Sequence, residues 1–231
     1  MIAFLAVVAG GIYVAFNYIG AQPPTVDYTS TASNGQVNVT LMTTAQSTVG
    51  DKPDWVTYFI QDPQTKQFVH TTYFKVPAAT RVNVTILGYD GCTPLRNPVW
   101  GKVTGTAGNV ENVSFFNGKT YSAPQPFSLF DTWANCSVQH TFAIPGLGLN
   151  VPIASVTTFN ENSNLCGNSP CVAPADASAP HTVVRFSFMT PKAGGTFRWQ
   201  CFVPCGLGYV DGNGGPMGTL GYMMGQMEVQ A

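Results

Sequence analysis

The sequence predicts an all-β fold in which two sheets pack face to face as a sandwich. Short runs rich in Val, Ile, Thr, Phe and Tyr recur along the chain, and Gly, Pro and Asn separate them. Residues 81–87 (RVNVTIL) and 182–189 (TVVRFSFM) alternate apolar and polar side chains, as strands with one solvated face do. About eight such runs, in a chain with no convincing amphipathic helix beyond its first residues, predict a β-sandwich.

The first 20 residues carry no charge and predict a membrane anchor. At a rise of about 1.5 Å per residue, such a helix matches a hydrocarbon core of about 30 Å. A cleaved signal peptide is the alternative, but no basic residue precedes Lys52 and Ile19-Gly20-Ala21 is a poor cleavage site. We therefore expect a single-pass anchor at residues 1–21, a Pro/Thr/Ser-rich linker at 22–35, and a C-terminal domain on the outer side of the cell membrane.

The outer domain is expected to span residues 36–231. Residues 92–133 are punctuated by Asn, Gly and Pro and are predicted to be an insertion at one edge of the sandwich. The expected strands are residues 36–43, 55–61, 67–76, 81–88, 137–144, 182–189, 195–202 and 224–229.

Composition excludes one class of partner and leaves two modifications open. Charged residues make up 9% of the chain and the net charge is −1, so there is no basic surface for nucleic acid. Six cysteines outside the cytosol predict disulfides, whose pairing the sequence leaves open. Four Asn-x-Ser/Thr sequons fit a glycoprotein, although an Asn/Thr/Ser-rich chain also produces them by chance; they begin at Asn38, Asn83, Asn112 and Asn135.

The run Cys201-Phe-Val-Pro-Cys205-Gly-Leu-Gly follows a predicted strand and has the pattern of a copper loop. Two thiolates four residues apart can reach one metal centre from a tight loop, and soft sulfur suits copper. Such a loop normally supplies an imidazole just after the second Cys. Tyr209 occupies that place, and no His follows Cys205.

An upstream segment completes the pattern. His140 stands near the end of a predicted strand and precedes Thr-Phe-Ala-Ile-Pro-Gly-Leu-Gly. Together with the Cys loop and the closing Met-Gly-Gln-Met-Glu-Val run at 224–229, this segment resembles the copper-binding domain of cytochrome oxidase subunit II, over residues 137–231. The resemblance implies a cupredoxin-like Greek-key sandwich behind a single N-terminal membrane helix.

In that family two bridging Cys, two His, a Met and a backbone carbonyl hold two copper ions. The resemblance assigns His140, Cys201 and Cys205 to the first His and the bridging thiolates. The second His would fall at Tyr209 and the Met at Gly212, so both are missing at those places.

Residues 210–220 appear inserted, and Met223 or Met224 beyond them could restore the thioether. We therefore expect a remnant copper site made of His140, Cys201, Cys205 and Met223 that has lost its metal. The two thiols are then expected to close as a disulfide, with the inserted loop folding over the vacated pocket and placing Tyr209 or a Met beside His140.

The resemblance implies that this chain is the non-catalytic subunit II of a membrane haem–copper terminal oxidase. Loss of the copper site implies a quinol oxidase, with haem and copper confined to the partner subunit I, whose outer face this chain would cap. One alternative is a membrane-tethered copper electron carrier that uses His140, Cys201 or Cys205, and a Met. Another is a pilin-like surface or filament protein.

Overall fold

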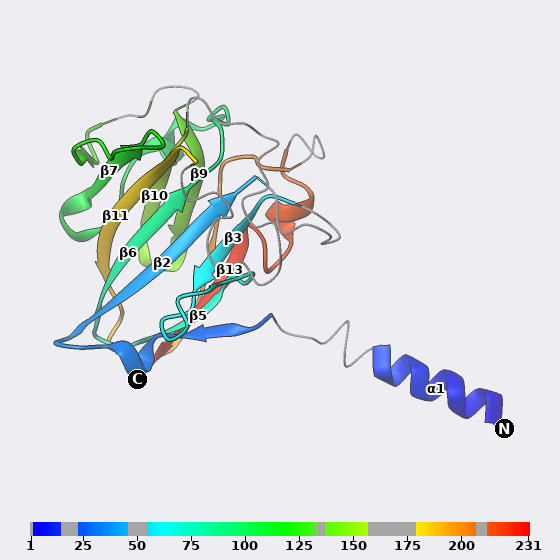
Figure 1. Ribbon diagram of the computed structural model, residues 1–231. Helices are drawn as coiled ribbons and strands as arrows, with labels where there is room; N and C mark the ends of the chain where they lie inside the picture. Colours follow the sequence, from blue (N-terminus) through cyan, green and yellow to red (C-terminus); the bar gives the residue numbers. More distant parts are fainter. Residues whose placement is uncertain are drawn as a thin grey trace.

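The computed structural model describes residues 2–14, 23–45, 55–131, 133, 137–156, 179–206 and 212–231. Two β-sheets face each other and form a sandwich, as the sequence predicted (Figure 1). Sheet A has the strand order β1-β5-β13-β12-β9-β10 and sheet B the order β4-β3-β2-β6-β11-β7-β8. The chain passes between the sheets repeatedly, so segments far apart in the sequence become neighbours.

The strands of sheet A, in spatial order, are β1 (Thr25–Asp27), β5 (Tyr73–Pro77), β13 (Met224–Gln230), β12 (Gly195–Gln200), β9 (Val138–Ile144) and β10 (Leu149–Ala154). Those of sheet B are β4 (Phe68–Val69), β3 (Thr57–Gln61), β2 (Gln36–Thr44), β6 (Arg81–Gly88), β11 (His181–Met189), β7 (Val110–Phe116) and β8 (Gln125–Ser128). Short 3-10 turns lie at η2 (Thr29–Thr31), η3 (Pro98–Gly101), η4 (Ala107–Asn109), η5 (Pro145–Leu147) and η6 (Gly215–Gly218).

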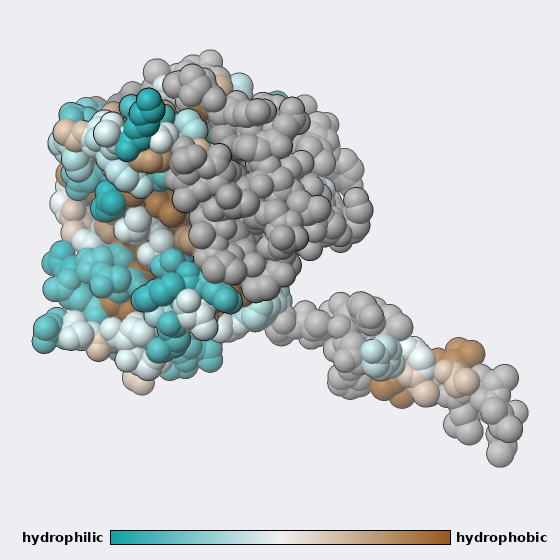
Figure 2. Space-filling model, in the orientation of Figure 1, coloured by the Kyte–Doolittle hydropathy of each residue, from teal (hydrophilic) through white to brown (hydrophobic). Residues whose placement is uncertain are grey.

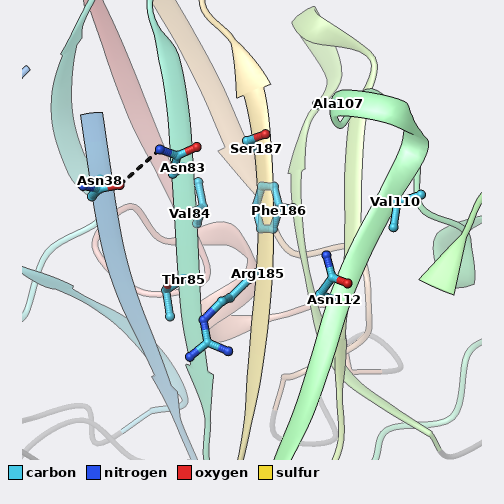
Figure 3. A pocket seen from close by; sticks show the side chains of 10 residues that line it. All are labelled: Asn38, Asn83, Val84, Thr85, Ala107, Val110, Asn112, Arg185, Phe186 and Ser187. Atoms are coloured by element: carbon cyan, nitrogen blue, oxygen red, sulfur yellow. Dashed lines mark hydrogen bonds between the residues drawn. The ribbon is translucent and has the colours of Figure 1, made fainter. Parts of the chain in front are cut away.

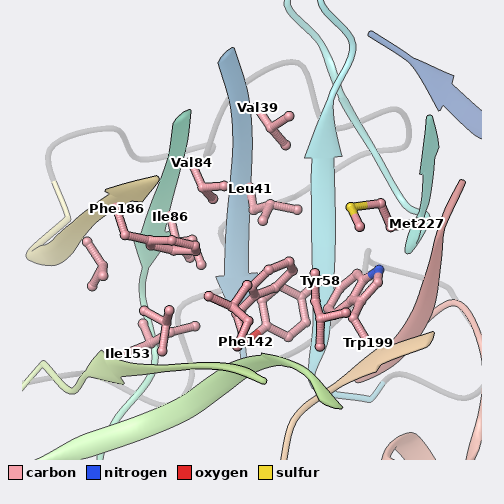
Figure 4. Packing of buried hydrophobic residues seen from close by; sticks show 14 of the residues in the cluster. Val39, Leu41, Tyr58, Val84, Ile86, Phe142, Ile153, Phe186, Trp199 and Met227 are labelled. Atoms are coloured by element: carbon pink, nitrogen blue, oxygen red, sulfur yellow. The ribbon is translucent and has the colours of Figure 1, made fainter. Parts of the chain in front are cut away.

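The core lies between the two sheets, and alternation along the strands builds it. On β6, Val82, Val84 and Ile86 are buried while the residues between them are exposed or half-buried. They belong to one buried cluster with Phe142 and Trp199 of sheet A, and Figure 4 shows Val84 and Ile86 within it. Burying each such side chain contributes about 1.5–3 kcal/mol, so this interface holds the two sheets together.

The expected strands are present, with several differences. The run 67–76 is divided into β4 and β5, which lie in different sheets. The segment predicted as a linker contains β1, which pairs in parallel with β5. The predicted edge insertion supplies β7 and β8, which do form one edge of sheet B. The strand β10 was not predicted at all.

The N-terminal segment begins with α1 (Ile2–Val14), a helix of 13 residues. Residues 15–20 of the predicted anchor lie outside the described part of the chain. Among the described residues, no helix combines the length and the hydrophobicity needed to cross a membrane.

Candidate metal centre

Two neighbouring strands of sheet A bring three metal-ligating side chains together. His140 lies on β9, and Cys201 follows the end of β12 directly, where Gln200 pairs with Ala143 of β9. The loop then turns back and places Cys205 against the same histidine. A hydrogen bond of 2.9 Å from the Cys201 amide to the Met223 carbonyl fixes the start of this loop.

The distances among the three donor atoms fit a bound metal ion. His140 Nδ1 lies 3.0 Å from Cys205 Sγ and 4.0 Å from Cys201 Sγ, and the two sulfurs are 3.5 Å apart. The point equidistant from all three lies about 2.1 Å from each, which is the radius of the circle through a triangle with those sides. Proteins hold zinc at about 2.0 Å from nitrogen and about 2.3 Å from sulfur. The donor set therefore has the spacing that a small metal ion requires.

Asp90 orients the histidine from the opposite sheet. It follows the end of β6, and its Oδ2 lies 3.0 Å from His140 Nε2. Because Nε2–H donates to this carboxylate, the neutral imidazole has its lone pair on Nδ1, the atom that faces the sulfurs. A carboxylate that holds the second nitrogen of a ligating histidine is a common feature of metal sites.

A buried glutamine positions Asp90 in turn. Gln139, next to His140 on β9, accepts hydrogen bonds through Oε1 from the Asp90 amide at 3.1 Å and from Thr43 Oγ1 at 2.9 Å. Its Nε2 donates to the Ala154 carbonyl at 2.6 Å. This network ties the ends of β2 and β6 in sheet B to β9 and β10 in sheet A, beside the donor atoms.

Burial and close contact set the protonation of the three donors. Burial alone would lower the pKa of His140, but hydrogen bonds to Asp90 and Cys201, with their negative charges, raise this pKa to about 9. Burial likewise opposes ionisation of Cys201, yet hydrogen bonds from Cys205 and His140 bring its pKa well below the usual value. Burial and the adjacent Cys201 thiolate raise the pKa of Cys205. These pKa shifts favour a negative charge on Cys201 beside a protonated His140, with the proton retained on Cys205.

The donor atoms are buried among core side chains, and a pocket reaches them from one side. His140 and Cys201 are each 1% exposed. Beneath them, buried Tyr58 donates a hydrogen bond of 2.9 Å to the Thr141 carbonyl and packs edge-on against Trp199. A pocket of about 250 Å³ reaches the site past Asp90, His140 and Cys205, so a metal ion can enter from this side.

The three side chains assigned to one site, His140, Cys201 and Cys205, converge in the structure. One other part of the predicted site is corrected. The expected disulfide between the two cysteines is wrong, because both are free thiols, with Cys205 directed at His140 and at the Val203 carbonyl.

Other residues that carry metal-ligating groups or stand in sequons lie in the core, away from the donor set or outside the described residues. Met223 is buried in the core beside the Cys loop. His181 sits among the rings of Tyr89, Phe116 and Tyr121, away from the donor set. Cys92 takes part in a disulfide. The residues outside the described part include Tyr209, Asn135, Cys136, Cys166, Cys171 and residues 210 and 211 of the proposed insertion.

Sequence reasoning missed Asp90 and Tyr58. Asp90 could have been noticed because it stands just after a predicted strand and because acidic residues are rare in this chain, which has 11 of them. Tyr58 gave no signal, because an aromatic residue in an apolar strand is typical of any core.

Comparison with known proteins identifies no family. No protein-family model matches the chain and no curated protein matches it. Among solved structures, the chain is similar to reduced rusticyanin at 13% identity and a TM-score of 0.35, covering 89% of this chain and 84% of that one. It is similar to rusticyanin from Thiobacillus ferrooxidans at 11% identity and a TM-score of 0.35, covering 91% and 84%. A further structure, described as the copper protein rusticyanin, matches at 15% identity and a TM-score of 0.31, covering 89% and 82%. Identities and scores this low do not establish the family of the chain.

Proposed function

We propose that the chain is a cupredoxin-like copper protein that carries electrons, with His140, Cys201 and Cys205 as ligands. The convergence of these three donors, with Asp90 holding the histidine, is the observation that supports the proposal. Two thiolates and an imidazole form a soft donor set that favours copper over hard cations such as magnesium. This geometry favours a working metal site over the empty remnant expected from the missing histidine.

Copper bound in this way would accept and release single electrons. The residues of the chain then have three tasks. Burial of His140 and Cys201 excludes water from the ligands. The Thr141 amide donates to Cys201 Sγ at 3.4 Å and stabilises negative charge on that sulfur. The Tyr58 hydrogen bond and the β9–β12 pairing hold the donors in place.

Met223 is proposed as a further ligand. Its amide and carbonyl fix it at the base of the loop, since the Met223 carbonyl accepts from the Cys201 amide and the Met223 amide donates to the Pro216 carbonyl. A thioether from this position would complete a set made of one nitrogen and three sulfurs.

Copper titration of the reduced full-length protein under anaerobic conditions tests the proposal. We expect one copper per chain, with thiolate-to-copper absorption that is lost in His140→Ala, Cys201→Ser and Cys205→Ser variants. His70→Gln is the matched control, because that histidine is hydrogen-bonded to Thr57 and is not one of the three donors. Binding that is absent, or that survives in the Cys201→Ser/Cys205→Ser double variant, contradicts the assignment.

A second candidate is subunit II of a haem–copper oxidase, anchored in the cell membrane by residues 1–21. One contact supports it in particular: the Val203 carbonyl lies between the two cysteines, 2.9 Å from Cys205 Sγ and 3.4 Å from Cys201 Sγ. The family that the sequence resembles uses a backbone carbonyl as a ligand in its copper loop. In this proposal the chain caps subunit I, which holds haem and copper and oxidises quinol, and is not catalytic by itself.

Purification from detergent-solubilised membranes separates the two candidates. As an oxidase subunit, the chain is expected to elute with a multi-span partner and with haem absorption. Elution alone, with copper but without haem, supports the independent carrier. Elution as a homopolymer would support the filament alternative instead.

A further inference from the structure

The outer face of sheet B carries a polar groove of about 420 Å³, separate from the metal centre. Strands β2, β6, β11 and β7 form its floor, and the turn containing Ala107 borders it (Figure 3). Figure 2 shows hydrophilic residues gathered over the lower part of the face on which these strands lie in Figure 1.

Strand register arranges the side chains of this face in rows. Arg81 pairs with Gln36 on one side and with Met189 on the other. The next outward row contains Asn38, Asn83 and Ser187, and the one after it contains Thr85, Arg185 and Asn112. The two arginines therefore lie in the rows on either side of the row that contains Asn38, Asn83 and Ser187.

Neither arginine meets a carboxylate among the described residues. Arg81 contacts Ser187 Oγ at 3.4 Å and Arg185 contacts Ser114 Oγ at 3.5 Å, both near the upper limit for a hydrogen bond. Two of the 10 cationic side chains of the chain are thus placed on this face with no carboxylate partner in the part of the chain that the structure describes. A pair of unneutralised guanidinium groups favours an anionic ligand.

The side-chain amides near the two arginines favour a ligand that carries hydroxyl groups as well as negative charge. Asn83 Nδ2 donates to Gln36 Oε1 at 3.0 Å and to Asn38 Oδ1 at 3.2 Å, a contact drawn in Figure 3. Three side-chain groups have no hydrogen-bond partner within the described part of the chain: Asn83 Oδ1, Asn38 Nδ2 and the side-chain amide of Asn112. Amides that donate and accept side by side match sugar hydroxyls, which do the same. The aromatic residue that lines the groove, Phe186, is buried and packs against Phe142 in the core, so it leaves no free ring face on which a nucleotide base could stack.

We propose that this groove binds an acidic saccharide chain. Carboxylates of the saccharide pair with Arg185 and Arg81, and its hydroxyls bind the amides of Asn38, Asn83 and Asn112. Arg185 lies four residues along β11 from the residue opposite Arg81, so the two positions are about 13 Å apart at about 3.3 Å per residue. A single inorganic anion cannot reach both, whereas a chain of a few acidic sugars can.

Calorimetric titration of the full-length protein with tetragalacturonate at low ionic strength tests this proposal. Binding is expected to weaken about tenfold or more in Arg81→Gln and in Arg185→Gln, to disappear in the double variant, and to weaken as salt is added. Arg198→Gln is the matched control, because this exposed arginine lies on β12 of the other sheet. Neutral maltotetraose is expected not to bind.

Three results would overturn the proposal. The first is equal binding of tetragalacturonate by wild type and the double variant. The second is inorganic sulfate binding as tightly as tetragalacturonate at the same arginines, which would leave no role for the sugar. The third is peptide mass spectrometry showing a glycan covalently attached at Asn38, Asn83 or Asn112, because that glycan would fill the groove. Circular dichroism of each variant verifies that it is folded, and copper loading is expected to leave saccharide binding unchanged.

Discussion

The hydrogen bond between Asp90 and His140 is one of several that couple the two sheets at the candidate metal site. Asp90 follows β6 of sheet B, whereas His140 lies on β9 of sheet A. The carboxylate fixes which imidazole nitrogen is free to bind metal and also increases the basicity of that nitrogen. Replacing this one group therefore tests whether the donor set is organised for a metal.

Asp90→Asn is expected to lower copper affinity by about 10- to 100-fold, since an amide holds the imidazole less firmly and carries no charge. Competition with a chelator of known affinity measures the change. Asp131→Asn is the control, because Asp131 is exposed and only accepts hydrogen bonds from Ser128. Equal affinities in the wild type and the Asp90→Asn variant would show that Asp90 has no role in metal binding.

Glu111 gives a pH dependence of stability that is independent of the metal. It is fully buried on β7; its Oε1 accepts from Trp133 Nε1 at 3.1 Å, and its Oε2 has no partner among the described residues. Burial raises the pKa of this carboxyl well above its usual value, despite the Trp133 hydrogen bond. The folded protein therefore keeps a proton that the unfolded chain releases above a pH of about 4.3.

The free energy of unfolding is accordingly expected to fall as the pH rises above that value, until the folded carboxyl itself ionises. Glu111→Gln, which keeps the Trp133 hydrogen bond and cannot ionise, is expected to remove this part of the decline. Urea unfolding of both proteins at pH 4 and pH 7 checks it. Equal losses of stability in the two proteins between these pH values would rule out a neutral Glu111.

At the scale of single residues, the sequence predicted the three donors that converge but not the groups that hold them in place. Cys201, Cys205 and His140 follow from spacing and from a family resemblance, which are local properties. Asp90 and Gln139 act only because β6 ends beside β9, and nothing local in the sequence encodes that proximity. The protonation of the donors could not be predicted from the sequence either, because it depends on burial and on contacts across the sandwich.

At the scale of elements, β13 and the segment before β5 approach unusually closely. The Thr72 carbonyl accepts hydrogen bonds from the Gln226 amide at 3.0 Å and from Trp199 Nε1 at 3.1 Å. A Cβ atom added at Gly225 would lie 2.0 Å from that carbonyl oxygen. Only glycine allows this approach.

Gly225→Ala is expected to destabilise the fold by about 3 kcal/mol or more, because backbone must move and the buried Trp199 loses its acceptor. Gly218→Ala is the control, since a Cβ there meets nothing within 4 Å. Denaturant unfolding of the two variants measures the difference. Similar stabilities would mean that the strand shifts without loss of these hydrogen bonds.

Strand prediction succeeded where polar and apolar residues alternate and failed where other signals dominate. Residues 81–88 were predicted and form β6 with the same bounds. The strand β10 was not predicted because Pro152 interrupts the sequence pattern of a strand. A proline is tolerated at this position since β10 is an edge strand of sheet A. The strands β1 and β8 have three and four residues and depend on their neighbours rather than on their own sequence.

At the scale of the whole molecule, metal binding is expected to raise thermal stability. A ligand that binds only the folded state stabilises it by about 2.7 kcal/mol at a concentration 100 times its dissociation constant. Thermal unfolding of the reduced protein with and without copper measures the shift, which a chelator should reverse. The Cys201→Ser/Cys205→Ser double variant is expected to unfold at the same temperature with and without copper. A copper-dependent shift in that variant would show that the metal binds at a different site.

The site is assembled from distant parts of the chain. In the sequence, His140 lies 65 residues from Cys205, and it lies 50 residues from Asp90, which holds its ring. An unfolded chain keeps the two thiols near each other but separates them from the imidazole. The colour of a bound metal would therefore act as an optical assay of folding. During refolding it should appear when β9 pairs with β12 and the loop after β12 brings Cys205 against His140. A misassembled product in which these two strands fail to pair would remain colourless, even with a normal content of strands.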